Sequence, residues 1–163
     1  MLFFIIELGT RLVHLADCKE HPTSIWVRQQ ARQLCWEFED KAPTFRYLLH
    51  DRDAKFTVTF DQVFATQNID VIHTPIRAPN ANAYAERWVR SARQECLDHL
   101  IIVNKRHLNS VLREYVRYYN TRRPHQGLGQ CGPDGSFESV NKGATYRREV
   151  LGGLINDYYR NVA

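Results

Sequence analysis

The fold is decided by a segment that begins with HDRDAKF (residues 50–56) and ends with PNANAYAERW (residues 79–88). Asp51 follows Tyr47-Leu48-Leu49, a short apolar run that is typical of a buried strand. A carboxylate directly after a buried strand lies at the rim of the sheet, where α/β folds place their ligands. Asp51 is therefore a candidate site residue.

Glu86 lies early on a predicted helix, which Asn80 or Asn82 can cap. The apolar face of this helix is predicted to consist of Ala85, Trp88, Val89, Ala92 and Cys96. This phase leaves Glu86, Arg90 and Arg93 on a different stripe, one turn apart. A carboxylate kept beside two arginines, and close to a strand-end carboxylate, suggests a metal site that faces a polyanion.

Spacing alone favours surface salt bridging for these two carboxylates, because most Asp and Glu side chains lie in water. A third ordered motif, YNTRRPHQGL (residues 119–128), favours the functional interpretation. Together the three motifs resemble the integrase core of DDE transposases, above all bacterial insertion-sequence transposases of the retroviral-integrase type. The family places an Asp after a central strand and a Glu on the following helix, and the 34 residues between Asp51 and Glu86 fit its interval.

The resemblance implies a metal-dependent enzyme that cleaves and joins DNA, with Asp51 as the second acidic ligand and Glu86 as the third. The complete family site holds two Mg²⁺ (or Mn²⁺) ions. Such a pair, about 3.5–4 Å apart, activates the nucleophile and stabilises the leaving oxygen, and Mg²⁺ prefers oxygen ligands. Asp53 is the competing ligand, but the matching family position is commonly glycine, which favours Asp51.

The first catalytic Asp of the family lies on its first strand, and no residue of this chain matches it. The strand that begins at Met1 matches the family's second strand, so we expect an N-terminally truncated core without a complete triad. Glu7 and Asp17 are poor matches and are better explained as structural or solvated residues. We therefore expect the 163-residue chain not to catalyse strand transfer by itself.

Positive charge is concentrated in one part of the chain. The net charge is +4, and the segment from Arg77 to Arg123 holds ten basic and four acidic residues, a local balance of +6. The resemblance implies that Arg90 and Arg93, with the adjacent Arg87, contact DNA. Phosphate contacts of this kind supply affinity rather than sequence choice. The alternative is a solvated helix face.

The motif at residues 119–128 supplies three further candidates for DNA contact, Asn120, Arg123 and His125. The resemblance places these polar residues near the active-site cleft, after a proline-terminated helix. For His125, orienting the backbone or DNA is favoured over acting as a catalytic base. Trp88 is expected in the core rather than as a platform for base stacking, since it is in phase with Ala85 and Ala92.

The predicted fold class is α/β, a ribonuclease H-like mixed sheet flanked by helices, with the first strand missing. We expect strands at 2–8, 12–16, 45–50 and 70–73, and helices at 24–38, at 57–67, around Glu86 to about residue 100, and at 106–119. The catalytic core is predicted at residues 1–128. Residues 129–163 are expected to form a loop and a short tail, or a hairpin that turns at Gly152-Gly153.

Four scattered cysteines without a C-x-x-C pair favour free thiols in a reducing cytosol. The resemblance implies that this is a bacterial cytosol and that the protein is associated with the nucleoid. The apolar start of the chain is too short for a membrane span and lacks the features of a signal peptide. The expected partners are mobile-element ends and target DNA, with several copies of the chain in the active assembly and no membrane. Two rival functions remain open: a decayed fragment that at most binds DNA, and another ribonuclease H-like nuclease.

Overall fold

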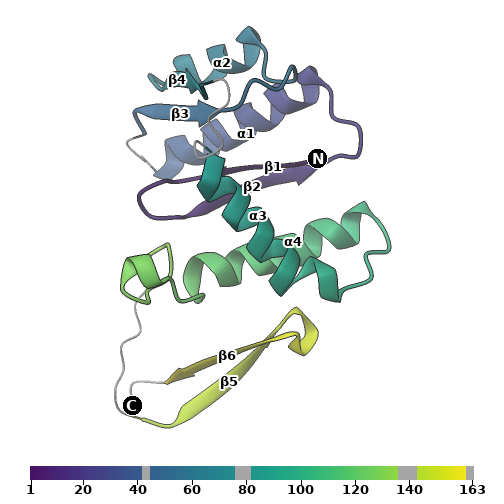
Figure 1. The fold of residues 1–163 in the computed structure, drawn as a ribbon, viewed down its shortest axis with the longest axis vertical. Helices are drawn as coiled ribbons and strands as arrows, with labels where there is room; N and C mark the ends of the chain where they lie inside the picture. The colour runs from purple at the N-terminus through teal and green to yellow at the C-terminus, as the bar shows by residue number, and fades with distance from the viewer. Residues whose placement is uncertain (42–44, 76–81, 136–142, 161–163) are drawn as a thin grey trace. The chain divides into compact units, whose positions relative to one another are not determined.

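Strands and helices alternate along the chain in the order that the apolar pattern predicts (Figure 1). The computed structural model describes residues 1–41, 45–75, 82–135 and 143–160. The chain divides into two compact units. The first consists of Met1–Phe4 and Ala16–Ala83, and the second of Ile5–Leu15 and Tyr84–Ala163. This division does not test the predicted domain boundary at residue 128, which stays a prediction.

The N-terminal strands β1 (Leu2–Ile6) and β2 (Val13–Cys18) pair as a hairpin. In the first unit, β2 is followed by α1 (Ser24–Lys41), β3 (Tyr47–His50), α2 (Val58–Ala65) and β4 (Asp70–His73). Strands β3 and β4 are parallel, with His50 opposite His73. Both strands therefore end at the same edge, as expected for a βαβ unit.

The core of the first unit forms where α1 packs on α2. The buried side chains of α1 are Val27, Ala31, Leu34, Cys35 and Phe38, and those of α2 are Phe60 and Phe64. The apolar pattern of this helix would also place Ile25 on the buried face, but the side chain of Ile25 is 69 % exposed. Two residues correspond to about 200° of helical rotation, so Ile25 and Val27 lie on opposite sides of α1.

The second unit contains α3 (Ala83–Glu95, apart from its first residue), η2 (Leu97–His99), α4 (Lys105–Thr121) and η3 (Gln126–Leu128). Its core includes Trp88, Cys96, Leu112 and Tyr115, so the prediction that Trp88 is a core residue is confirmed. Val89, predicted on the apolar face, is exposed. Helix α3 ends earlier than predicted because Cys96 leaves helical geometry, with φ −137° and ψ −71°.

The predicted C-terminal hairpin is present as β5 (Thr145–Val150) and β6 (Ile155–Arg160), antiparallel strands joined by η4 (Leu151–Gly153). Gly152 adopts φ 65° in this turn, a conformation that favours glycine. The fold class is α/β, as predicted. Among the described residues the strands are distributed over three two-stranded sheets, and no described helix has the length and hydropathy needed to cross a membrane.

Candidate functional site

Asp51 is the first residue after β3, and its side chain is exposed. One carboxylate oxygen, Oδ1, accepts the backbone N–H of Asp53 at 3.1 Å. The intervening residue, Arg52, donates from Nε to the carbonyl oxygen of Thr74, which follows β4, at 3.1 Å. The loop that carries Asp51 is therefore held at the shared edge of the two parallel strands, as the sequence predicts for a rim carboxylate.

Asp53 differs from Asp51 in its electrostatic surroundings. The Asp53 carboxylate accepts the Lys55 backbone N–H at 2.9 Å and forms an ion pair with Lys55 Nζ at 2.7 Å. Hydrogen bonds from the Lys55 side chain and backbone lower the pKa of Asp53. Among the described residues, Oδ2 of Asp51 has no partner. Asp51 is thus the better placed of the two carboxylates to bind a cation.

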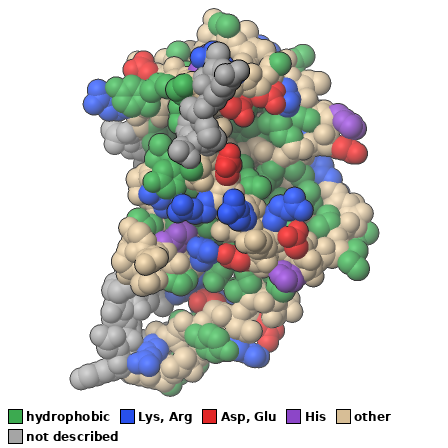
Figure 2. All heavy atoms as spheres, in the orientation of Figure 1, with side chains coloured by type: hydrophobic (Ala, Val, Ile, Leu, Met, Phe, Trp, Pro, Cys, Tyr) green, Lys and Arg blue, Asp and Glu red, His purple; other side chains and the backbone are tan. Residues whose placement is uncertain are grey.

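Glu86 lies in the first turn of α3 and is exposed. A carboxylate is favourable there because the N-terminal end of a helix carries partial positive charge. Three exposed arginines follow on the same helix: Arg87, Arg90 and Arg93. Arg93 Nε lies 3.5 Å from Asp98 Oδ1, a solvated pair. Figure 2 shows Lys and Arg side chains gathered in a row on the face that carries α3 in Figure 1.

Asn120 uses its side-chain amide within the protein. Its Oδ1 accepts the backbone N–H of Val13 at 3.0 Å, and its Nδ2 donates to the Val13 carbonyl oxygen at 2.8 Å. Both residues belong to the second unit. The two bonds attach the start of β2 to the last turn of α4, a contact that sequence analysis missed because 107 residues separate the partners. This contact favours a positioning role for Asn120.

Arg123 forms a bidentate ion pair with Glu95, the last residue of α3. The distances are 2.6 Å from Nη2 to Oε1 and 2.9 Å from Nε to Oε2. The Tyr115 hydroxyl also donates to Glu95 Oε2, at 2.9 Å. Burial opposes ionisation of Glu95, but the hydrogen bonds and charge of Arg123 prevail, and the pKa of Glu95 is lowered. The Glu95 hydrogen bond likewise raises the pKa of Arg123.

His125 packs edge-on against Tyr119, with ring centroids 4.7 Å apart. Burial, and then the charge of Arg123, lower the pKa of His125, so the ring is neutral near pH 7. Its Nε2 is buried and has no hydrogen-bond partner among the described residues. The residues of the 119–128 motif are therefore held by contacts within the second unit, and their predicted contacts with DNA stay predictions.

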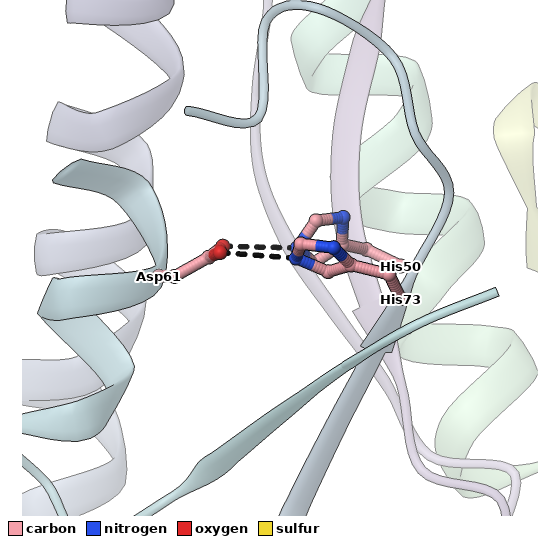
Figure 3. Close-up of side chains that lie close together, drawn as sticks. All are labelled: His50, Asp61 and His73. Atoms are coloured by element: carbon pink, nitrogen blue, oxygen red, sulfur yellow. Dashed lines mark hydrogen bonds and ion pairs between the residues drawn. The ribbon is translucent and has the colours of Figure 1, made fainter. Parts of the chain in front are cut away.

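One cluster of potential metal ligands was missed by sequence analysis. Within the described residues, His50, Asp61 and His73 offer ligand atoms that all lie within 4.8 Å of one another (Figure 3). The histidines end β3 and β4, and Asp61 lies in the first turn of α2. The signal was available in the sequence, since both predicted strands end in histidine.

Comparison with known proteins identifies a family match for the part of the chain that contains Glu86 and the 119–128 motif. Residues 67–133 match a family model described as "Integrase core domain", and this segment includes Glu86, the three arginines of α3 and the 119–128 motif. Asp51 lies outside it. No curated protein sequence has a significant match to the chain.

A similar solved structure is the catalytic core domain of BIV integrase, which is 18 % identical in sequence, with a TM-score of 0.57 and 82 % of each chain covered. At this identity the likeness establishes the fold. The chain therefore shares the ribonuclease H-like fold of that catalytic core domain, and its residues 67–133 match the integrase core domain model.

Proposed function

We propose that the chain is the DDE-type integrase core of an enzyme that acts on mobile-element DNA by metal-dependent phosphodiester cleavage and strand transfer. Because no residue of this chain matches the first catalytic Asp of the family, we expect the chain by itself not to catalyse strand transfer. The observation that carries the proposal is the surface of α3, where Glu86 stands with three exposed arginines inside the segment that matches the integrase core domain. A carboxylate supplies a metal ligand, and the arginines supply counter-charges for phosphate. This combination is suited to a polyanionic substrate.

Asp51 and Glu86 are the proposed ligands of Mg²⁺ or Mn²⁺. Both are exposed carboxylates, and they fit a hard cation that takes oxygen ligands and keeps several waters. The unpartnered oxygen of Asp51 supports its assignment, while Lys55 already neutralises Asp53. When bound, the ions would activate a water or a 3′-hydroxyl for in-line attack and stabilise the leaving oxygen.

The chain's own basic residues hold the substrate. Arg87, Arg90 and Arg93 bind backbone phosphates and so contribute affinity that is independent of base sequence. Asn120, Arg123 and His125 are further proposed DNA contacts, and each also has a contact within the second unit that orients it. DNA ends and target duplex are the proposed partners. Because the enzyme would act on element ends and on target duplex together, the proposed active form is an assembly of several copies of the chain. Its proposed location is the bacterial cytosol, at the nucleoid.

The test is Mn²⁺ binding, measured by electron paramagnetic resonance on the full chain and on three variants. Asp51→Asn and Glu86→Gln each remove one charged ligand and should weaken binding by about tenfold or more, with circular dichroism unchanged. Asp53→Asn is the matched control and should keep the wild-type affinity. Wild-type Mn²⁺ affinity in both Asp51→Asn and Glu86→Gln would contradict the assignment.

Substrate assays separate the proposed function from its two rivals. Metal-dependent cleavage and joining of element-end duplexes supports an integrase core. Cleavage confined to RNA–DNA hybrids or branched DNA would indicate a different nuclease of the same fold. Duplex binding without cleavage, in the presence of Mn²⁺, would indicate a DNA-binding fragment.

A further inference from the structure

The cluster of His50, Asp61 and His73 brings together three side chains from three elements of the first unit. Asp61 uses both carboxylate oxygens: Oδ1 lies 3.0 Å from His50 Nε2, and Oδ2 lies 3.0 Å from His73 Nε2. Figure 3 shows the two rings side by side and directed at the carboxylate, and their centroids are 4.7 Å apart. His50 is buried, whereas the side chain of His73 is 41 % exposed.

The hydrogen bond of His50 Nδ1 determines which atom or ion can lie between His50 Nε2 and Asp61. His50 Nδ1 lies 2.5 Å from the backbone carbonyl oxygen of Asp51. A carbonyl oxygen can only accept, so Nδ1 carries the proton, and in the neutral ring Nε2 presents a lone pair to Asp61. An ionised carboxylate also only accepts. Two acceptors at 3.0 Å need either a proton or a metal cation between them.

We propose that His50, Asp61 and His73 bind a divalent transition-metal ion of the Zn²⁺ class. Two imidazole nitrogens and one carboxylate oxygen form a donor set that suits Zn²⁺ and its neighbours rather than Mg²⁺. Bonds of about 2.0–2.2 Å around a tetrahedral ion place ligand atoms about 3.3–3.5 Å apart. The two separations of 3.0 Å therefore need only a small outward movement of the side chains.

The bond from His50 to the Asp51 carbonyl supports this assignment independently of the cluster itself. Histidines that bind metals usually donate their other ring N–H to a carbonyl or carboxylate, which fixes the tautomer and directs the lone pair at the ion. His50 has this arrangement. With three protein ligands, the fourth position is left for water, which can enter on the exposed side of His73.

Such an ion would join the ends of β3 and β4 to the first turn of α2. It would also fix the His50 ring that holds the Asp51 backbone. The site is separate from the proposed Mg²⁺ ligands because it uses neither the Asp51 side chain nor Glu86. Its test is therefore independent of the proposed function.

The experiment uses the full chain, stripped of metal with a chelator, and then titrated with Zn²⁺ by calorimetry and with Co²⁺ by visible spectroscopy. We expect one Co²⁺ per chain, with the absorption of a four-coordinate site and no thiolate charge-transfer band. Cys96 in particular is a poor ligand, because burial raises the pKa of its thiol to about 11. Zn²⁺ at one hundred times its Kd should raise Tm by about 5–10 °C.

Variants assign the ligands. Loss of an outer-sphere partner lowers metal affinity by about 10- to 100-fold. His73→Gln and Asp61→Asn each remove a direct ligand, so each should weaken Zn²⁺ binding by more than that. His73 is exposed, so its variant should fold even if one at the buried His50 does not. His21→Gln is the matched control, because His21 is exposed and its one ion-pair partner among the described residues is the exposed Glu20. Asp51→Asn should lower Mn²⁺ affinity but not Zn²⁺ affinity, since the backbone carbonyl remains.

Three results would overturn the proposal. The first is no Zn²⁺ binding by the wild-type chain, which would leave only a hydrogen-bonded cluster. The second is equal Zn²⁺ affinity in wild type, His73→Gln and Asp61→Asn. The third is a thiolate band with Co²⁺, which would place the ion on cysteine.

Discussion

Replacement of Arg123 by alanine is expected to lower the free energy of unfolding by about 2 kcal/mol. The change removes both hydrogen bonds of the ion pair with Glu95, at 2.6 and 2.9 Å. Among the described residues, the Tyr115 hydroxyl is then the one remaining donor to that carboxylate. One hydrogen bond to a charged group contributes about 1.5–3 kcal/mol. Two such hydrogen bonds would contribute twice this value. However, the side chains of Arg123 and Glu95 are 26 % and 32 % exposed, so water can hydrogen-bond to Glu95 in the variant and reduces the loss of stability.

The pH dependence of this loss identifies its cause. Burial favours the protonated form of Glu95, but Arg123 outweighs burial and brings the pKa below its ordinary value of 4.5. The stability contributed by the pair is therefore fully present above pH 4.5 and is lost as the pH falls through the native pKa. The difference between wild type and Arg123→Ala should be largest near neutrality and should shrink on acidification.

Urea unfolding followed by circular dichroism at a series of pH values measures both effects. Arg123→Lys is the matched control, because it keeps the charge but loses the bidentate geometry, and it should recover part of the stability. Glu95→Gln combined with Arg123→Ala completes a double-mutant cycle. A stability loss that does not change between pH 7 and pH 3 would refute the reasoning. So would unchanged stability together with a smaller salt dependence of DNA binding, which would make Arg123 a phosphate contact instead.

Two further predictions concern α4 and α3. Gly132→Ala should cost about 1–3 kcal/mol, because a Cβ there would lie 2.8–2.9 Å from backbone atoms of the last turn of α4. Gly127→Ala is the control, with nothing within 4 Å, and equal unfolding midpoints for the two variants would contradict this reasoning. Arg90→Ala with Arg93→Ala should weaken duplex binding equally across sequences and reduce the salt slope by about one unit per lost phosphate contact. Arg32→Ala on α1 is the comparison, and unchanged binding at low salt would leave the α3 stripe as a solvated face.

Local sequence was sufficient for most elements of the fold. The strand at Asp70–His73 has its predicted bounds, because Pro75 follows it and its apolar pattern is short and clear. The helix around Glu86 was predicted with Trp88 inward and the arginines outward, which the periodicity alone specifies. Its end was predicted too late, since nothing in the apolar pattern marks the break at Cys96.

Local sequence patterns do not predict contacts between residues that are far apart in the chain. The predicted DNA contact of Arg123 stays a prediction, and the structure adds an ion pair between its guanidinium and Glu95, 28 residues earlier. The amide of Asn120 is occupied by the backbone of Val13 in the same way. A polar residue in a motif looks the same in sequence whether it binds a ligand or another part of the chain. Only the tertiary contact distinguishes the two.

The histidine cluster is a different case, because the predicted elements imply it. In a βαβ unit the two parallel strands end at one edge, and the connecting helix begins there. His50, Asp61 and His73 occupy these three ends. Successive side chains in extended backbone point to opposite sides, so the arrangement that exposes Asp51 turns His50 inward toward α2. Asp51, a proposed ligand of Mg²⁺, and its neighbour His50, a proposed ligand of Zn²⁺, are therefore directed to opposite faces of the same sheet edge.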